Sequence, residues 1–96
     1  MIVSVSVEAE AELIEAARHY TAEAGTQLGR SLIAEFERTL AMLAEHPQLG
    51  APWRGTQRMS LRRFPYSVVY TASNTEVRVI ALAHHRRKPG YWATRG

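Results

Sequence analysis

The stretch from Tyr66 to His84, YSVVYTASNTEVRVIALAH, decides the fold because it contains two strand-like runs separated by a turn. The first run, YSVVYTA, alternates large and small residues with the two-residue period of a strand. SNT, residues 73–75, is a typical turn sequence. The second run, EVRVIALAH, is predicted to place four apolar residues on one face: Val77, Val79, Ala81 and Ala83. We therefore expect an antiparallel hairpin at the centre of a sheet.

Two further strands and a loop are predicted outside this hairpin. RMSLRRF, Arg58–Phe64, reads as a strand that precedes the hairpin, and Pro65 marks an edge or a bend. The N-terminal MIVSVSV is β-branched and alternating, which predicts a short strand. The residues from His46 to Thr56 contain two prolines and two glycines, so we expect a loop there.

Between the first strand and this loop, the apolar period changes to that of two helices. Gly25 is a natural stop for the first helix, Thr26 can cap the second, and Pro47 ends it. The predicted apolar stripes are Leu13, Ala16 or Ala17, Tyr20 and Ala24 in the first helix, and Leu28, Leu32, Ile33, Phe36, Leu40 and Leu43 in the second. The short connection favours an antiparallel helical hairpin. We predict one α+β domain over residues 1–96, with order β-α-α-β-β-β and the hairpin packed on a small antiparallel sheet.

Composition excludes several classes of protein. The 96 residues include no cysteine, which removes disulfides, thiol nucleophiles and cysteine-ligated zinc. No apolar run approaches the roughly 20 residues of a membrane helix. The N-terminus lacks the basic start of a signal peptide, so a cytoplasmic protein is expected.

The net charge of +3 conceals an asymmetry between the two halves of the chain. Up to Gln48 there are eight glutamates and three arginines, whereas from Leu49 there are nine cations and one glutamate. Eleven of the twelve cations are arginines, whose guanidinium groups bind phosphates and carboxylates with two hydrogen bonds. The basic half therefore suggests an acidic or polyanionic partner.

The polar residues contain no complete catalytic motif. His84 and His85 are adjacent on a predicted strand and point to opposite faces, so no metal site is expected there. The sequence has no aspartate and no GxSxG motif, which argues against a serine nucleophile. The glutamates are interpreted as the solvated surface of the helices.

A group of cations interleaved with aromatic residues is the remaining candidate site. Strand pairing can bring Arg62 and Arg63 into one patch with the residues after His84. The patch would include Arg58, Arg62, Arg63, Arg86, Arg87 and Lys88, with Tyr66, Tyr91 and Trp92 beside them. Such a patch can bind nucleic acid or form a protein interface. Alternatively, the tyrosines belong to the core and Trp92 covers the end of the sheet.

The ordered set of motifs resembles the RelE/ParE toxin superfamily of type II toxin–antitoxin modules. The matching stretches are EAEAELIEAARHY, LAEHPQLG, RRFPYSVVY and VRVIALAHHRRKPGYW. The resemblance covers nearly the whole chain and implies a small bacterial cytoplasmic toxin, without a cofactor, that a cognate antitoxin neutralises. It implies antitoxin contacts along the helices and the sheet, for which we select Leu13, Tyr20, Phe36, Leu40 and Tyr70.

The superfamily contains two mechanisms. RelE-like members cleave messenger RNA on the ribosome, and that branch would use Arg58, Arg62, His85, Arg86 and Tyr91 here. However, Ser67 stands where this branch carries an arginine, and the only lysine of the chain is Lys88. ParE-like members instead bind DNA gyrase without catalysis, and HHRRKPGYW resembles their C-terminal region.

We therefore favour a ParE-like gyrase toxin. Its predicted target contacts are Arg62, Arg63, Arg86, Arg87, Lys88, Tyr91 and Trp92. A ribosome-dependent ribonuclease is the alternative, and a degenerate partner that binds antitoxin but poisons nothing is a third hypothesis. Residues 93–96, ATRG, have nothing obvious to bury, so we expect them to fray.

Overall fold

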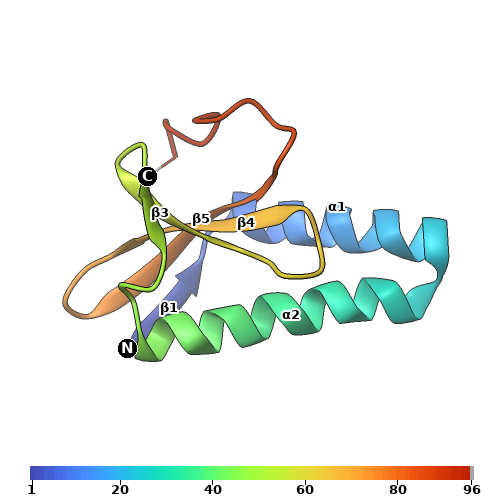
Figure 1. The fold of residues 1–96 in the computed structure, drawn as a ribbon, viewed down its shortest axis with the longest axis horizontal. Coiled ribbons are helices and arrows are strands. Elements are labelled where there is room, and N and C mark those ends of the chain that lie inside the picture. The colour runs from blue at the N-terminus through green and yellow to red at the C-terminus, as the bar shows by residue number, and fades with distance from the viewer. Residues whose placement is uncertain (96) are drawn as a thin grey trace.

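The computed structural model describes residues 1–95, which form two helices on one face of a five-stranded sheet (Figure 1). The predicted α+β order is confirmed, with one additional short strand. The elements are β1 (Ile2–Val5), α1 (Val7–Ala24), α2 (Thr26–Glu45), β2 (Ala51–Trp53), β3 (Thr56–Ser60), β4 (Tyr66–Ala72) and β5 (Glu76–His84). No helix within residues 1–95 is long and apolar enough to cross a membrane.

The two helices begin differently. The Ser6 hydroxyl accepts a hydrogen bond from the Ala9 N–H at 3.1 Å, so Ser6 caps α1 and ends the N-terminal strand before Val7. The prediction that Thr26 caps α2 is wrong, because Thr26 is already helical and Gly25 holds the cap position without a side-chain bond. Gly25 has φ +98, and glycine tolerates this reversal because it has no Cβ.

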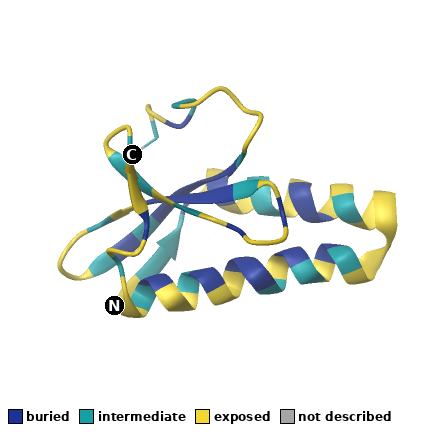
Figure 2. Ribbon diagram, in the orientation of Figure 1, coloured by how far each residue is buried: buried dark blue, intermediate teal, exposed yellow. Residues whose placement is uncertain are grey.

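Small residues let the helices approach each other and the sheet. A Cβ on the buried Gly29 would lie 2.2 Å from Thr21 Oγ1 and 2.8 Å from the Ala17 carbonyl oxygen. On α1 the buried residues are alanines: Ala9, Ala16 and Ala17. The helical hairpin therefore packs closely, with its buried residues facing the sheet (Figure 2).

The strand order is β1-β5-β4-β3-β2, and the sheet is mixed rather than purely antiparallel. β1 pairs with β5 in parallel, from Ile2 opposite Glu76 to Val5 opposite Val79, while the other pairs are antiparallel. The direction of β1 depends on how the helical hairpin connects β1 to the consecutive strands β2–β5. Because that path is a tertiary property, the sequence of β1 does not reveal it.

A β-bulge changes the faces of β5. Val69 pairs with Ala81 and Tyr70 pairs with Val79, so Ile80 is an extra residue on β5. The prediction that Val77, Val79, Ala81 and Ala83 share a face is therefore wrong. Val77, Val79 and Leu82 pack in the core beneath the helices, whereas Ile80, Ala81 and Ala83 pack on the opposite face.

The predicted loop after α2 contains the edge strand β2. Trp53 pairs with Thr56 across a two-residue turn in which Arg54 has φ 50 and Gly55 has φ 79, the conformation of a tight hairpin. Tyr70 fixes the preceding residues, since its hydroxyl donates to the Pro47 carbonyl at 2.8 Å and accepts from the Gly50 N–H at 2.9 Å. The edge of the sheet is thus held to the core.

β3 is shorter than predicted and ends at Ser60 instead of Phe64. Leu61 and Phe64 are buried, and the Leu61 N–H donates to the Tyr66 carbonyl at 2.8 Å, so the chain bends immediately after Ser60. Arg62 and Arg63 therefore lie in the β3–β4 connection and not on a strand.

Candidate functional site

The C-terminal segment, defined here as residues 85–95, folds back over the face of the sheet opposite α2 (Figure 1). Trp92 anchors it with only 2% of its surface exposed. The Trp92 ring lies 4.5 Å from the Trp53 ring and 5.3 Å from the Tyr91 ring. Beneath it is a small second core formed by Val69, Ile80, Ala81 and Ala83. Trp92 was predicted to contact a target, but its side chain is part of this core.

The carboxylate of Glu12 on α1 fastens the same segment. Glu12 Oε2 accepts the Tyr91 hydroxyl at 2.6 Å, and Oε1 accepts Arg95 at 2.9 Å. Oε1 also accepts the Leu82 N–H of β5 at 3.1 Å, beyond the last residue that pairs with β1. Burial, together with the hydrogen bond and charge of Glu12, raises the pKa of Tyr91 above its usual value. The interpretation of the glutamates as a solvated surface is therefore wrong for Glu12.

The end of the segment is ordered as far as the structure describes it. The Arg95 N–H donates to the Trp92 carbonyl at 2.8 Å, and its guanidinium also donates to the Ile80 carbonyl at 3.2 Å. The prediction that residues 93–96 fray is wrong for Ala93 to Arg95, and Gly96 lies outside the described residues. Arg95 is held in place because its guanidinium binds the Glu12 carboxylate of α1.

Three consecutive cations, Arg86, Arg87 and Lys88, remain exposed on this fastened segment. The backbone turns sharply after β5, since Arg86 N–H donates to His84 Nδ1 and Arg87 N–H to the His84 carbonyl, both at 3.0 Å. The Arg87 guanidinium stacks 3.8 Å from the Tyr91 ring centre. The cationic groups are thereby presented from a short, ordered loop.

The predicted arginines gather at one end of the sheet but on different sides of it. The His85 N–H donates to the Pro65 carbonyl at 2.9 Å, which joins the β3–β4 connection to the C-terminal segment. Arg62 and Arg63 line a groove against α2. Arg58 stacks 4.2 Å from the Trp53 ring and lines a small cavity of about 130 Å³ with His85 and Arg87 on the opposite face.

The two histidines occupy opposite faces. The His84 ring lies 4.9 Å from the Tyr66 ring beside α1, and burial, with nearby Arg86, His85 and His19, lowers the His84 pKa. His85 Nε2 lies 3.1 Å from Ser67 Oγ, which is itself 3.1 Å from Ser60 Oγ. Sequence reasoning missed this chain of side chains because Ser60 and Ser67 match no motif, although strand alternation places both on one face. Within residues 1–95 no three metal-binding side chains converge.

The residues selected for antitoxin contact belong to the layer between the helices and the sheet. Phe36 and Tyr70 are 3% and 0% exposed. Leu13, Tyr20 and Leu40 are partly buried against the same core, and the Tyr20 ring lies 5.1 Å from Phe64. Phe36 and Tyr70 therefore offer almost no surface, and the structure gives these two residues a packing role.

Comparison with known proteins places this geometry in a family. Residues 3–89 match the family model described as the ParE toxin of the type II toxin–antitoxin system parDE. The chain belongs to the ParE toxin family. The matched range includes Glu12 and the exposed cations, whereas Tyr91, Trp92 and Arg95, which fasten the segment in this ParE-family protein, lie beyond it.

A solved structure shares the ParE fold. It is described as the chromosomal ParDE TA system from P. aeruginosa, and it superposes with a TM-score of 0.77 at 18% identity. The match covers 88% of this chain and 95% of that chain. No curated protein matches the sequence.

Proposed function

We propose that this ParE-family toxin inhibits DNA gyrase by direct contact through Arg86, Arg87 and Lys88, and that a cognate antitoxin neutralises it in the bacterial cytoplasm. The observation that carries the proposal is the presentation of three exposed cations on a segment held by Trp92 and Glu12. An ordered loop loses little conformational entropy when it binds, so its contacts contribute more of their energy to affinity.

Family membership supports the toxin role, and the surface chemistry supports binding. Arginine and aromatic residues dominate the energetics of protein interfaces, and Arg87 stacked on Tyr91 supplies both at the centre of the segment. Arg86, Arg87 and Lys88 place three cations side by side on this surface. Such a surface is suited to an acidic patch on a protein target.

The decisive experiment is a gyrase supercoiling assay with relaxed plasmid and ATP. The wild type should inhibit supercoiling, and Arg86→Ala/Arg87→Ala should inhibit at least about tenfold less, as expected for two contacts of moderate strength. Trp92 stays intact in these variants because its side chain belongs to the core.

The matched control is Arg18→Ala/Arg30→Ala, which removes two exposed arginines from the helices. It should inhibit like the wild type. Equal activity of both double variants would remove the C-terminal segment from the mechanism, and an inactive wild type that is folded would remove gyrase as the target.

A ribosome-dependent ribonuclease is the second candidate. One observation favours it: His85, linked to Ser67 and Ser60, lies in the same small cavity as Arg58 and Arg87. A histidine can accept the 2′-hydroxyl proton and arginines can stabilise the developing phosphate charge. The other three residues of the predicted set do not line this cavity. Arg62 lines the groove on the helical side, the Tyr91 hydroxyl donates to Glu12, and Arg86 is exposed on the C-terminal segment.

Translating ribosomes with a reporter messenger RNA test this candidate. Under the ribonuclease hypothesis, Arg58→Ala and His85→Ala should each lower cleavage by about 100-fold or more. Cleavage that both variants retain in full, or a wild type that cleaves nothing, would contradict it.

A further inference from the structure

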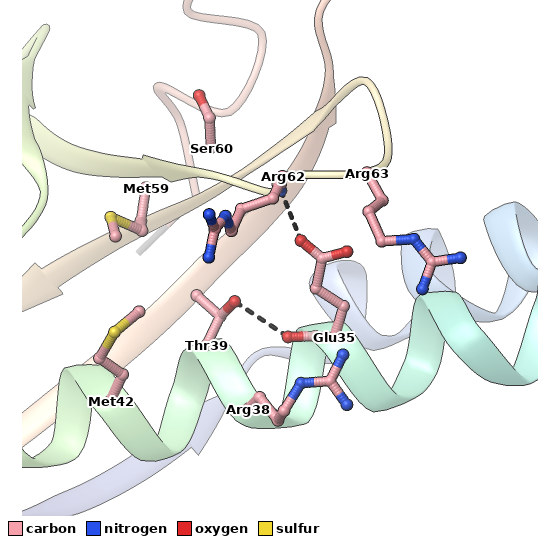
Figure 3. Close-up of a pocket in the computed structure, with 8 residues that line it drawn as sticks. All are labelled: Glu35, Arg38, Thr39, Met42, Met59, Ser60, Arg62 and Arg63. Atoms are coloured by element: carbon pink, nitrogen blue, oxygen red, sulfur yellow. Dashed lines mark hydrogen bonds between the residues drawn. The ribbon is translucent and has the colours of Figure 1, made fainter.

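A groove lies between α2 and the end of β3, and the C-terminal segment does not line it (Figure 3). It has a volume of about 520 Å³. Its charged side chains are Glu35 and Arg38 from α2 and Arg62 and Arg63 from the β3–β4 connection, with Met42 and Met59 at one end. We call it the α2–β3 groove.

Glu35 is the least expected residue of the groove. It is only 6% exposed, and one carboxylate oxygen, Oε2, accepts the Arg62 backbone N–H. The other oxygen, Oε1, is buried and has no hydrogen-bond partner among residues 1–95. A buried carboxylate oxygen without a hydrogen-bond donor destabilises the folded protein. Because the described chain supplies no donor, Oε1 can accept a hydrogen bond from a binding partner.

The groove also contains three guanidinium groups without a carboxylate partner in the described chain. Within residues 1–95, none of Arg38, Arg62 and Arg63 is paired with a carboxylate. The Arg63 guanidinium lies 5.8 Å from the centre of the Phe64 ring, which is a distant contact. Three cations that converge on one groove favour an acidic ligand, and the flexible side chains of Met42 and Met59 can adapt to an apolar residue.

The backbone of β3 is open at the same place. β2 covers β3 only as far as Arg58, which pairs with Ala51, whereas β4 continues to Ser60. The Leu61 N–H points to β4, so strand alternation directs the N–H and C=O of Ser60 to the open side. The next group on that side is the Arg62 N–H, which Glu35 already holds.

We propose that the α2–β3 groove binds an extended acidic segment of the antitoxin, which adds a short strand at Ser60 and donates a hydrogen bond to Glu35 Oε1. This inference rests on the proposed function, because it assumes an antitoxin partner. A peptide matches the groove since it carries backbone donors, backbone acceptors and carboxylates together. Phosphate groups bring only acceptors, which would leave Glu35 unpaired beside an additional negative charge.

The proposal assigns the antitoxin to residues other than the five selected from the sequence. Phe36 and Tyr70 hold the core together, whereas the groove exposes unpaired charge and an open strand edge. Acidic side chains of the bound segment would face Arg38, Arg62 and Arg63. One backbone N–H, hydroxyl or amide would face Glu35.

Calorimetric titration of the full-length toxin with the antitoxin encoded beside it tests the proposal. Arg62→Glu/Arg63→Glu should weaken binding roughly 30-fold or more, because buried charge pairs become repulsive. Glu35→Gln should weaken it about tenfold, since the amide still accepts the Arg62 N–H but presents a donor to the groove. The matched control, Arg18→Glu/Arg30→Glu, reverses two exposed charges on the helices and should bind like the wild type.

Amide hydrogen exchange provides the second measurement and needs no variant. Antitoxin should protect the Ser60 amide strongly and leave the Arg62 amide, already bonded to Glu35, nearly unchanged. Wild-type affinity in both groove variants, or an unprotected Ser60, would overturn the groove while leaving the toxin–antitoxin pairing intact.

Two other outcomes would each overturn the proposal, and the measurements distinguish between them. If a single-stranded RNA oligonucleotide, but not the antitoxin, loses affinity in Arg62→Glu/Arg63→Glu, the groove is a nucleic-acid site and the proposal fails. If the antitoxin does not bind the folded wild type at all, the antitoxin part of the proposed function fails, and the groove proposal fails with it.

Discussion

At the scale of single residues, Glu12 joins three parts of the chain through one carboxylate. It binds Tyr91 and Arg95 of the C-terminal segment and the backbone of Leu82 in β5. The side chains of Glu12 and Arg95 are 17% and 20% exposed, so solvent screens this ion pair less than a surface pair. Glu12 therefore connects α1 to the segment proposed to bind the target.

The hydrogen bond between the Tyr91 hydroxyl and Glu12 should make the free energy of unfolding depend on pH in alkaline solution. Its pKa is raised in the folded state by burial and by Glu12, so its contribution to stability is complete below about pH 10, the usual tyrosine value, and is lost as the pH rises further. Tyr91→Phe should lower the free energy of unfolding by about 1–2 kcal/mol at pH 8, because a hydrogen bond to a charged group is removed.

Urea unfolding of both proteins at pH 8, 9, 10 and 11 measures this contribution. The difference between wild type and Tyr91→Phe should be constant up to pH 9 and narrow above pH 10. A difference that does not change with pH would show that the Tyr91 hydroxyl is not held by Glu12 in solution.

Residue-level prediction from the sequence failed mainly at two glutamates. Glu12 and Glu35 lie among other glutamates on helices, so pattern alone assigned them to a solvated surface. Their partners are 83 and 27 positions away in the chain, Arg95 for Glu12 and the Arg62 amide for Glu35. Such contacts depend on tertiary packing, which helical periodicity does not encode.

At the scale of elements, the second core beneath the C-terminal segment determines how that segment is held. Trp92 covers Val69, Ile80, Ala81 and Ala83 on the face that the helices leave open. Trp92→Ala should lower the free energy of unfolding by about 3–5 kcal/mol, the usual cost of deleting a large buried aromatic side chain. Thermal and urea unfolding provide the measurement.

The matched variant is Trp53→Ala, since Trp53 is its partner in the ring contact but is only partly buried. Its cost should be smaller than that of Trp92→Ala. Equal stability of Trp92→Ala and wild type would mean that the segment does not cover the sheet in solution.

The elements themselves were largely predictable because their signals are local. Both helices, β4 and β5 follow from the apolar period and from glycine and proline positions. The bulge at Ile80, the strand β2 and the early end of β3 were not predicted, because each is set by pairing with a neighbouring strand. The parallel direction of β1 was not predicted for the same reason.

At the scale of the whole molecule, the charge asymmetry in the sequence becomes a separation between layers. Eight of the nine glutamates lie on α1 and α2, and nine of the twelve cations lie in the sheet, its connections and the C-terminal segment. A field of one sign on the sheet layer speeds encounter with an acidic partner and depends on ionic strength.

We therefore expect association with the proposed target, DNA gyrase, to be sensitive to salt. Between about 50 and 300 mM NaCl the dissociation constant should rise by roughly tenfold or more, while the unfolding midpoint in urea changes little. Titrations over this range measure the slope. Arg86→Ala/Arg87→Ala should give a flatter slope than Arg18→Ala/Arg30→Ala, and identical slopes would show that the segment does not carry the electrostatic attraction.

The stacking of Trp53 against Trp92 also gives the protein a built-in optical reporter. The two indoles are the only tryptophans in the chain, and their centres are 4.5 Å apart. The strong far-ultraviolet transitions of rings this close couple, so the folded protein should have a far-ultraviolet circular dichroism couplet that depends on both rings. Displacement of the C-terminal segment would abolish the couplet and shift tryptophan emission to longer wavelength. Movement of the segment on binding a target or an antitoxin can thus be followed in real time, without a label.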